Sequence, residues 1–369
     1  MDSLNIHTVI VGAGVVGMAI ARELALRGTE IVVLEAEPTI GSVISARNSG
    51  VIHAGLYYAP GSLKARYCVA GRDMLYAYAA ERGIWHQRCG KLVVATNPDE
   101  IDVLHKLKDN AEKNGVTDLQ HLTRAEAQSM EPELSCVAAL LSPSSGLIDV
   151  HALLEAFAYD ATSHGALLQC HSRYLRTEIR NGGGFSVYVE GDDGVSYSIE
   201  CRELINTGGL EAQKIAGTIE GFDQTLIPEQ LLGKGSYFFL EGQKAPFSRL
   251  IYPLPIPGSS GLHCRRDING RCVLGPDFEI VDHIDYRVDP GRTKYFFENV
   301  RRYFPKLRAE CLVPDYAGIR PKLKQHSDFI VQYEGDHKIP GLVNCFGIES
   351  PGVTSCMALG REIVMRLYK

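Results

Sequence analysis

No run of about 18 apolar residues, the length that a transmembrane helix requires, occurs in this sequence of 369 residues. The amino-terminal stretch also lacks a basic segment followed by an apolar one, so we expect neither a secretory signal nor a transmembrane segment. Charge of one sign is not in large excess, because 38 basic and 44 acidic side chains give a net charge of −6. No basic stripe occurs, so a nucleic-acid partner is disfavoured.

Cysteine does not occur in the spacings that bind metals. The ten cysteines are scattered singly, without a CxxC pair or a Cys/His cluster, which argues against a metal site. Scattered thiols suit a reducing compartment, so we expect reduced cysteines and a cytoplasmic protein. Repeats, low-complexity tracts and long linkers are also absent. The length predicts about two domains, which without a linker we expect to be interleaved.

The stretch VIVGAGVVG, residues 9–17, combines an apolar strand with GxGxxG spacing. Gly12 allows a tight turn, Gly14 removes the Cβ atom that would meet a phosphate, and Gly17 lets the following helix pack on the strand. The free N–H groups at the start of that helix then face an anion. The motif alone is weak evidence, because the chain contains 37 glycines.

The residues after the motif support a nucleotide site. Residues 15–27 form an amphipathic pattern that Gly28 ends, and residues 31–34 form a second apolar strand that leads to Glu35. An acidic side chain at this strand end can accept hydrogen bonds from ribose hydroxyls. A carboxylate there argues against a 2′-phosphate, which leaves FAD or NAD as the dinucleotide.

Further along the chain, helical and strand patterns alternate and then change in character. Helices are expected at residues 63–82, 100–114, 123–130, 149–165, 292–303 and 353–365, and strands at 88–95, 166–170 and 203–209. Residues 233–276 contain GSYFFLEG, RLIYPLPIP and GRCVLGP between prolines and glycines, which predicts an antiparallel sheet. We therefore expect an α/β fold in which a Rossmann-like nucleotide domain (1–86, 146–220 and 318–369) is interleaved with a mostly antiparallel α+β substrate domain (87–145 and 221–317).

Four separated blocks resemble the FAD-dependent oxidoreductases of the D-amino-acid oxidase and glycerol-3-phosphate dehydrogenase superfamily. They are GAGVVG with Glu35, RNSGVIHAGLYY, GIRP at 318–321 and ESPGVTSCMALG. Within that superfamily the chain is similar to L-2-hydroxyglutarate dehydrogenases and oxidases, which share NSGVIHAGLYY, GSLKARYCVAG, CGKLVVA, SSGLID and LIYPLPIP. It departs from them at Arg47, where this subfamily often has histidine, and in a terminal turn that is less rich in alanine and proline.

This resemblance implies FAD as the cofactor and extends the expected contacts along the chain. The loop 45–50 offers hydroxyl, guanidinium and amide groups, although it could also be a solvated turn. Gly208 and Gly209 end an apolar strand, where either cofactor contact or a structural turn would need glycine. The terminal turn begins a helix whose amides could stabilise charge at the flavin N1/O2 edge, or it is an ordinary helix cap. The expected cofactor residues are Gly12, Gly14, Val16, Gly17, Glu35, Ala36, Ser45, Arg47, Asn48, Ser49, Gly50, Val51, Gly208, Gly209, Gly347, Ser350, Pro351, Gly352, Val353 and Thr354.

Oxidation of a 2-hydroxy acid removes a hydride from the α-carbon and a proton from the hydroxyl group. His53 is the candidate base, because the ordinary histidine pKa near 6.5 suits proton transfer at neutral pH. Arg320 is the candidate carboxylate-binding residue, because a guanidinium grips two oxygens in a fixed geometry. Tyr57 and His263 are further candidates for lining the substrate pocket. Each of these side chains could instead be structural, and His53 could instead tether flavin covalently.

The sequence therefore predicts FAD-dependent conversion of L-2-hydroxyglutarate to 2-oxoglutarate. The alternatives are an amine or amino-acid oxidase of the same fold, acting on glycine or sarcosine, and a flavoprotein without turnover that serves as a redox sensor. The expected partners are a small carboxylate substrate and an electron acceptor. The acceptor stays open between oxygen and a quinone, which would require peripheral contact with a membrane. A second cation is expected for the distal carboxylate of the substrate, and the sequence does not identify it.

Overall fold

The computed structural model describes residues 3–255 and 261–368 and contains a parallel sheet that carries the glycine motif. Five neighbouring strands run parallel, and two of them, residues 31–34 and 342–346, are mainly apolar and buried on both faces. In spatial order they are β9 (Leu167–Gln169), β2 (Ile31–Leu34), β1 (Ser3–Val11), β12 (Ser196–Asn206) and β20 (Leu342–Phe346). Antiparallel strands extend the sheet: β10 (Arg173–Ile179) and β11 (Phe185–Glu190) beside β12, and β19 (Ile330–Gln332) beside β20.

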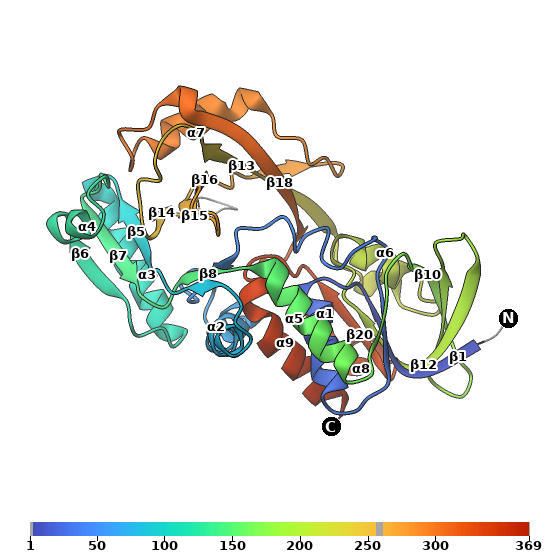
Figure 1. Ribbon diagram of the computed structural model, residues 1–369. Helices are drawn as coiled ribbons and strands as arrows, with labels where there is room; N and C mark the ends of the chain where they lie inside the picture. The colour runs from blue at the N-terminus through green and yellow to red at the C-terminus, as the bar shows by residue number, and fades with distance from the viewer. Residues whose placement is uncertain (1–2, 256–260, 369) are drawn as a thin grey trace.

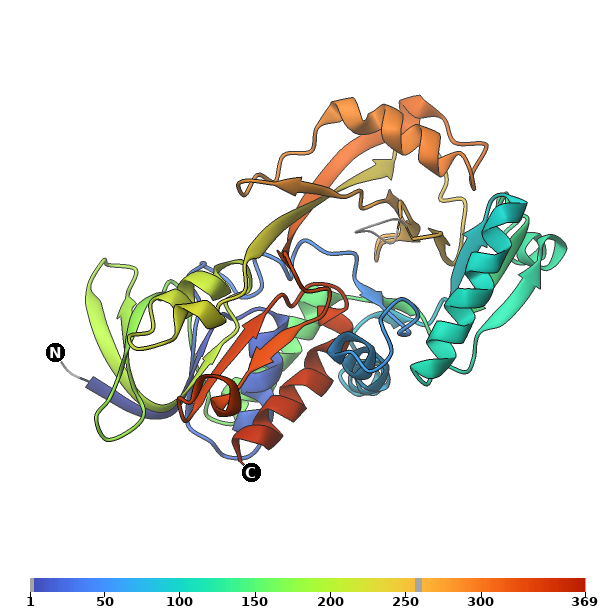
Figure 2. The same cartoon turned by 180° about the vertical axis from the view of Figure 1, so that it is seen from behind.

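Helices cover one face of this parallel sheet, as Figures 1 and 2 show. They are α1 (Val15–Ala25), α5 (Val150–Ser163), α9 (Gly352–Leu367) and, packed on α9, α2 (Leu63–Glu81). Along β1 the side chains alternate between the faces. Ile10 packs towards these helices, whereas Val9 and Val11 pack on the other side with α6 (Ala212–Gly217) and β11. The glycine motif is therefore held between two hydrophobic cores.

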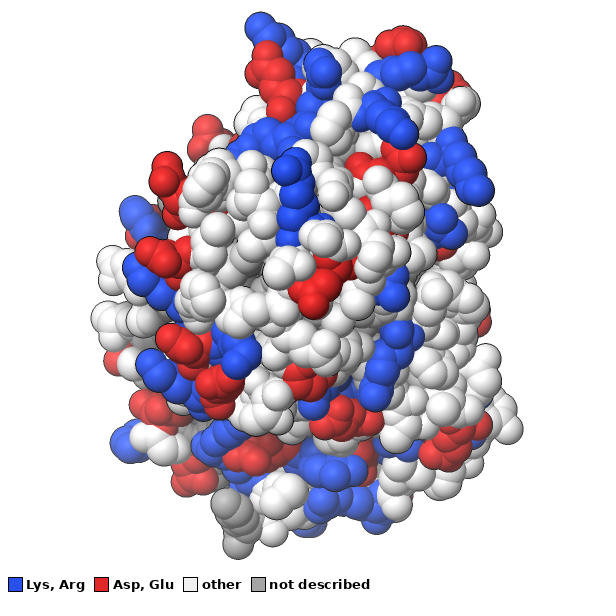
Figure 3. Space-filling model, turned by 90° about the vertical axis from the view of Figure 1, so that its left-hand side faces the viewer, with Lys and Arg blue, Asp and Glu red and all other residues white. Residues whose placement is uncertain are grey.

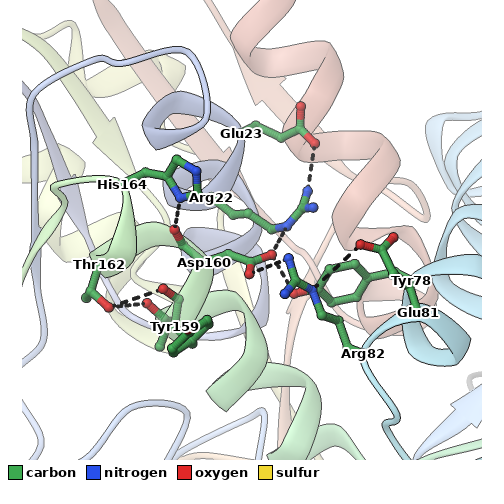
Figure 4. A network of polar contacts seen from close by, with 10 residues as sticks. Arg22, Glu23, Tyr78, Glu81, Arg82, Tyr159, Asp160, Thr162 and His164 are labelled. Atoms are coloured by element: carbon green, nitrogen blue, oxygen red, sulfur yellow. Dashed lines mark hydrogen bonds and ion pairs between the residues drawn. The ribbon is translucent and has the colours of Figure 1, made fainter.

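A buried carboxylate ties three of these helices together (Figure 4). Asp160 of α5 accepts hydrogen bonds from Arg22 Nε of α1 at 2.8 Å and from the Tyr78 hydroxyl of α2 at 2.9 Å. Arg82, which follows α2, adds an ion pair at 2.7 Å. Because Asp160 is only 2% exposed, its charge requires such partners. The network fixes α1, and with it the turn that begins α1.

A second sheet forms the other half of the molecule. Its spatial order is β17 (Glu279–Val281), β13 (Gln230–Leu240), β16 (Cys272–Leu274), β15 (Cys264–Arg266), β14 (Leu250–Pro253), β5 (Lys91–Ala95), β7 (Ala138–Ser142) and β6 (Gln120–Thr123), with β18 (Leu312–Leu323) along β13. Its pairs are antiparallel except for β5 with β14. Helices α3 (Ile101–Lys113), α4 (Arg124–Met130) and α7 (Thr293–Val300) pack on this sheet.

A small sheet connects the two halves. It contains β3 (Val51–Ile52), β8 (Gly146–Ile148) and β4 (His86–Gln87), all antiparallel. The loop before β3, residues 41–50, runs between the parallel sheet and the long strands β13 and β18 in both views (Figures 1 and 2). At Gly318 of β18 a Cβ atom would meet the carbonyl oxygen of Arg47, so this glycine lets the loop pack against the strand. The remaining helix is α8 (Glu334–His337).

The expected α/β class, with a parallel and a mostly antiparallel sheet, is confirmed. The helix expected at residues 123–130 is present as α4, and Thr123 and Glu126 form a capping box at its start. Two elements are shorter than expected. Strand β5 begins only at Lys91, and α7 ends at Val300, where a turn follows. Within RLIYPLPIP the strand β14 ends at Pro253, and residues 256 and 257 lie outside the described part of the chain.

The expected division into two domains stays a prediction. Its boundary at residue 318 falls inside β18, which pairs with β13 continuously from Ala317 to Leu323. The boundary at residue 86 likewise falls inside β4. These strands therefore pass from one half of the molecule to the other without a linker.

Charged side chains of both signs are interspersed on the face seen in Figure 3. Within residues 3–255 and 261–368, no helix has both the length and the apolar character needed to cross a membrane. The same residues contain no group of three or more His, Cys, Asp or Glu side chains placed to hold a metal ion. Each of the ten cysteines is free.

Candidate active site

A cavity of about 1070 Å³ lies between the parallel sheet and the long strands of the second sheet. Its wall begins at the turn after β1 and continues along loop 41–50 to His53 and Arg320. This volume slightly exceeds the usual range for small-molecule sites, about 300–1,000 Å³. All of the expected cofactor residues line this cavity except Gly17 and Gly347.

The turn from β1 to α1 has the geometry that its glycines predict. Gly12 has φ of +103°, and a Cβ atom there would lie 2.6 Å from the Thr207 carbonyl oxygen. At Gly14 a Cβ atom would meet only Ser45 Oγ, at 3.4 Å, so the space before the helix is open. The first turn of α1 faces that space, with the Val15 N–H bonded to Ser45 Oγ at 3.0 Å. This end of the cavity can accept a phosphate group.

Gly17 has a packing role and lies outside the cavity wall. A Cβ atom there would clash with the Gly12 carbonyl oxygen and would lie 2.7 Å from Thr207 Oγ1. Gly347 has φ of +68°, and a Cβ atom there would lie 2.7 Å from the Leu323 side chain. Both glycines therefore allow close packing directly behind the cavity wall.

Glu35 lies at the end of β2, as expected, and lines the cavity. Its Oε2 atom accepts the Ala13 N–H at 2.8 Å, and its Oε1 atom accepts the Glu37 N–H at 2.9 Å. These bonds fix the carboxylate, and each oxygen retains a further lone pair. The geometry is compatible with the ribose contact that the sequence predicts.

The polar side chains of loop 45–50 are bonded mainly to the protein. Asn48 Nδ2 donates to the Ser45 carbonyl oxygen at 2.6 Å, and Asn48 Oδ1 accepts the Gly50 N–H at 2.8 Å. Ser49 Oγ is 2.8 Å from the Tyr237 hydroxyl, and Arg47 lies 4.1 Å over the ring of Tyr286. The loop is thus a fixed wall, and its contacts with Tyr237 and Tyr286 could not be predicted from the sequence pattern because both residues are distant in the chain.

The strand end at Gly208 and the terminal turn complete the cofactor half of the wall. Gly209 has φ of +59°, and the Gly208 N–H donates to Asn206 Oδ1 at 3.2 Å. Helix α9 begins at Gly352 on the cavity wall. The positive end of its dipole therefore faces the cavity, beside His53.

His53 lies where β3 meets the terminal turn. Its Nε2 atom is 3.4 Å from Ser350 Oγ, and its Nδ1 atom is buried without a hydrogen-bond partner. Burial and, secondarily, the nearby Lys91 ammonium keep the pKa of His53 well below its ordinary value of 6.5. The imidazole is therefore neutral at pH 7 and can accept a proton.

Arg320 lies on β18 opposite Gly233 of β13, and its side chain lines the same cavity as His53. No hydrogen bond or ion pair to its guanidinium occurs within the described residues. A Cβ atom at Gly235 would lie 3.3 Å from Arg320 Nη2, so this glycine leaves room for the side chain. An unpaired guanidinium in a cavity wall is suited to bind a carboxylate.

The cavity wall near β14 is aromatic. Tyr252 stacks on His263 with ring centroids 4.2 Å apart, and the ring of Tyr57 lies 6.5 Å from that of Tyr252. Both His263 nitrogens and the Tyr57 hydroxyl are buried without a partner. Burial and the neighbouring Arg265 lower the pKa of His263 well below 6.5. His263 and Tyr57 line the cavity, as expected from the sequence, and these polar atoms have no partner within the described residues.

Several side chains near the cavity were not identified from the sequence. Lys64 and Glu349 line the wall as an ion pair at 2.9 Å, and Glu349 also pairs with Lys322 at 2.8 Å. Lys91 is fully buried directly behind the aromatic wall. Its position in the apolar run CGKLVVA could have identified Lys91 as an unusual buried residue, because lysine is rarely fully buried unless it is paired.

The arrangement fits an FAD molecule together with a small carboxylate substrate. Gly12 and Gly14 open the phosphate end, where Glu35 is held for a ribose. The opposite end carries the neutral His53, the unpaired Arg320 and unpartnered polar atoms on Tyr57 and His263. Such orphaned atoms are costly unless a ligand satisfies them.

The sequence matches the family of FAD dependent oxidoreductases over residues 7–366. It is 40% identical to an L-2-hydroxyglutarate dehydrogenase, mitochondrial, of Arabidopsis thaliana, covering 99% of this chain and 84% of the relative. The fold is similar to an L-alpha-glycerophosphate oxidase from Mycoplasma pneumoniae with FAD bound, with a TM-score of 0.90 and 24% identity over 100% of this chain and 96% of that one. It is also similar to a glycine oxidase from Geobacillus kaustophilus, with a TM-score of 0.83 and 21% identity over 99% and 95% of the two chains.

Proposed function

Because the chain belongs to the family of FAD-dependent oxidoreductases and is therefore an enzyme that uses FAD, we propose that it oxidises L-2-hydroxyglutarate to 2-oxoglutarate. The observation that carries the proposal is that one cavity is lined by a neutral His53 and by Arg320, whose guanidinium has no partner within the described residues. A proton acceptor and a carboxylate-binding group are the two functions that a 2-hydroxy acid demands. The similarity to a plant enzyme of that name supports the same substrate.

Arg320 orients the substrate. Its guanidinium would grip the carboxylate next to the hydroxyl-bearing carbon through two parallel N–H donors. Since Arg320 has no partner in the described residues, no internal ion pair has to break first.

His53 takes the hydroxyl proton. Its Nε2 atom faces Ser350 at the end of the cavity where α9 begins, so a substrate oxygen held near both residues would donate its proton there. Bound FAD supplies the acceptor for the hydride that leaves the α-carbon, at flavin N5. The amino-terminal end of α9 and the Gly352 backbone would stabilise the negative charge that develops on the cofactor. The pyrophosphate would be held by Gly12 and Gly14, and the adenosine ribose by Glu35.

The second candidate is an amine or amino-acid oxidase of the same fold. The likeness to a glycine oxidase favours it at the level of fold alone, because the identity is 21%. Arg320 would serve either reaction equally. His53 favours the hydroxy acid, because a neutral amine can lose a hydride without a base for a hydroxyl proton.

The electron acceptor and the compartment remain as predicted from the sequence. The acceptor stays open between oxygen and a quinone at a membrane surface. A cytoplasmic location stays a prediction, since the similar plant dehydrogenase is named mitochondrial.

Anaerobic mixing of the holoenzyme with a substrate panel tests the proposal. The panel contains L-2-hydroxyglutarate, its D enantiomer, L-lactate, glycine and sarcosine, and the loss of flavin absorbance is followed. We expect L-2-hydroxyglutarate to bleach the flavin fastest and to yield 2-oxoglutarate. Rapid bleaching by sarcosine or glycine, with none by L-2-hydroxyglutarate, would contradict the proposal and favour the amine oxidase.

A further inference from the structure

Lys91 is a fully buried lysine that contacts aromatic rings but has no hydrogen-bond or ion-pair partner within the described residues. It lies at the start of β5 with 0% exposure, between β7 and β14. Within the described part of the chain its Nζ atom has no hydrogen-bond partner and no carboxylate in contact. A buried ammonium without a partner destabilises a folded protein, so its presence calls for a function.

The surroundings of Lys91 do not neutralise it. The nearest groups that favour its charge are the thiols of Cys68 and Cys89, and burial raises the pKa of both thiols. Burial lowers the pKa of Lys91 to about 8, so the side chain is still mainly protonated at pH 7. The cation is thus present and unbalanced in the protein alone.

Lys91 lies directly behind the part of the cavity wall that carries unpartnered donors. Its Nζ atom is 4.3 Å from the ring centroid of Tyr252 and 5.3 Å from that of Tyr57. Both tyrosines line the cavity, and Tyr252 stacks on His263. The Tyr57 hydroxyl and the His263 nitrogens have no partner within the described residues, and the positive charge of Lys91 lies close behind these side chains.

Three other cations near the cavity have a protein partner or an assigned role. Lys64 is paired with Glu349. Arg265 donates to the Tyr316 hydroxyl at 3.0 Å, although its Nε atom has no partner within the described residues. Arg320 is assigned to the first carboxylate of the substrate. Lys91, in contrast, has no hydrogen-bond or ion-pair partner within the described residues and no assigned role.

We propose that Lys91 is the specificity residue for the second, distal carboxylate of a dicarboxylate substrate, with the Tyr57 hydroxyl and a His263 ring N–H as the hydrogen-bond donors. This inference rests on the proposed function for the role of Arg320. Arg320 and Lys91 then carry one positive charge for each carboxylate. The pocket selects a dianion over a monocarboxylate, because a ligand without the second carboxylate leaves the Lys91 charge uncompensated.

The test measures binding of two unreactive acids to the FAD-loaded enzyme by calorimetry. Glutarate carries two carboxylates, whereas butyrate has a similar chain with one. We expect Lys91→Met to weaken glutarate binding by about 10- to 100-fold, the range for a hydrogen-bonded charge, and to leave butyrate binding within about 2-fold. Lys106→Met is the control, since it removes one exposed charge from α3 without touching the cavity.

A melting curve without ligand separates this role from a structural one. Lys91→Met should raise the melting temperature, because it removes an unpaired buried charge and keeps a chain of similar length. Lys91→Gln serves as the second uncharged variant if the methionine variant does not fold. A lower melting temperature together with equal loss of both acids would overturn the proposal.

Arg265→Met identifies the competing assignment. If this variant, and not the Lys91 variants, abolishes the preference for glutarate, the proposal is wrong. Because neither acid is oxidised, the binding result does not depend on turnover. An enzyme that oxidises sarcosine yet prefers glutarate through Lys91 would overturn the proposed function alone.

Discussion

The main-chain N–H of His53 donates to Thr354 Oγ1 at 3.0 Å, and so joins the candidate base to the first turn of α9. The same hydroxyl donates to the Val51 carbonyl oxygen at 3.3 Å. Thr354 is fully buried, and a Cβ atom at Gly71 of α2 would clash with its carbonyl oxygen. One threonine therefore sets the position of His53 relative to the helix end at which the flavin is expected.

Thr354→Val should uncouple the two segments. The change leaves the buried His53 N–H and Val51 carbonyl without this partner, which costs about 1–3 kcal/mol for each unsatisfied group. We expect a lower unfolding midpoint in urea and slower flavin reduction by substrate. Thr354→Ser keeps the hydroxyl and should retain most of the rate, and equal rates in the valine variant and the wild type would contradict this role.

His53→Asn should slow flavin reduction and leave FAD binding intact. Removal of a general base typically costs about 10²- to 10⁴-fold in rate. The measurement is the rate of anaerobic bleaching at saturating L-2-hydroxyglutarate, with the flavin content of the purified protein as the control. A variant that bleaches at the wild-type rate would show that His53 is not the base.

The dependence of the wild-type rate of flavin reduction on acidic pH tests the same residue. His53 accepts a proton only when neutral, and burial and Lys91 hold its pKa well below 6.5. The neutral form therefore predominates at pH 6.5 and above, and the rate should fall only at more acidic pH. A fall that is already complete at pH 7 would contradict this environment.

Arg320→Lys should be poorly tolerated although it keeps the charge. Lysine cannot form the two parallel bonds of a guanidinium to a carboxylate. We expect kcat/KM for L-2-hydroxyglutarate to fall by about 10- to 100-fold, and further in Arg320→Met. If the lysine variant matches the wild type in steady-state kinetics, Arg320 does not grip the carboxylate.

The two glycines at the start of α1 should respond differently to alanine. A Cβ atom at Gly14 meets only Ser45 Oγ at 3.4 Å, so Gly14→Ala should fold normally but bind FAD more weakly, as fluorescence titration of the apoprotein would report. At Gly17 the Cβ atom would clash with the Gly12 carbonyl oxygen, so Gly17→Ala should mainly lose stability. Equal FAD affinity in Gly14→Ala and wild type would argue against pyrophosphate contact there.

The preference for dicarboxylates should fall as the pH rises through about 8. Lys91 is charged below its pKa of about 8 and neutral above it, so the preference is full on the acid side and lost on the alkaline side. The other titratable groups near Lys91 do not produce this step. Burial raises the pKa of the neighbouring thiols and tyrosines above their ordinary values and lowers the pKa of the neighbouring histidines below 6.5. These groups are Cys68, Cys89, Tyr57, Tyr252, His53 and His263. The ratio of glutarate to butyrate affinity measures this, and the step should be missing in Lys91→Met.

The parts of the fold that depend on local pattern could be read from the sequence. The strand Ile31–Leu34 has the expected bounds, and α1 begins directly after Gly14, because glycines and apolar periodicity punctuate the chain there. Helix α7 is shorter than its sequence pattern predicts, because the residues after Val300 form a turn that buries Tyr303 and Phe304. Tertiary packing overrode the local signal at that end.

The site was only partly visible in the sequence. His53 and Arg320 came from the family resemblance, and the structure has them on one cavity wall. Lys91 was not identified from the sequence, because its neighbours in space are distant in the chain. The pairing of Lys91 with Leu250 places β14, and with it Tyr252, beside β5. No periodicity within either strand encodes that pairing. The polar partners of loop 45–50, such as Tyr237, were hidden for the same reason.

One measurement tests the central claim most directly. The holoenzyme is mixed without oxygen with L-2-hydroxyglutarate carrying either hydrogen or deuterium at the α-carbon, and flavin absorbance and 2-oxoglutarate are followed together. Transfer of that hydrogen as hydride predicts slower bleaching with deuterium, and 2-oxoglutarate formed in equal amount to the flavin reduced. Flavin that stays oxidised with L-2-hydroxyglutarate but is bleached by sarcosine would contradict the account.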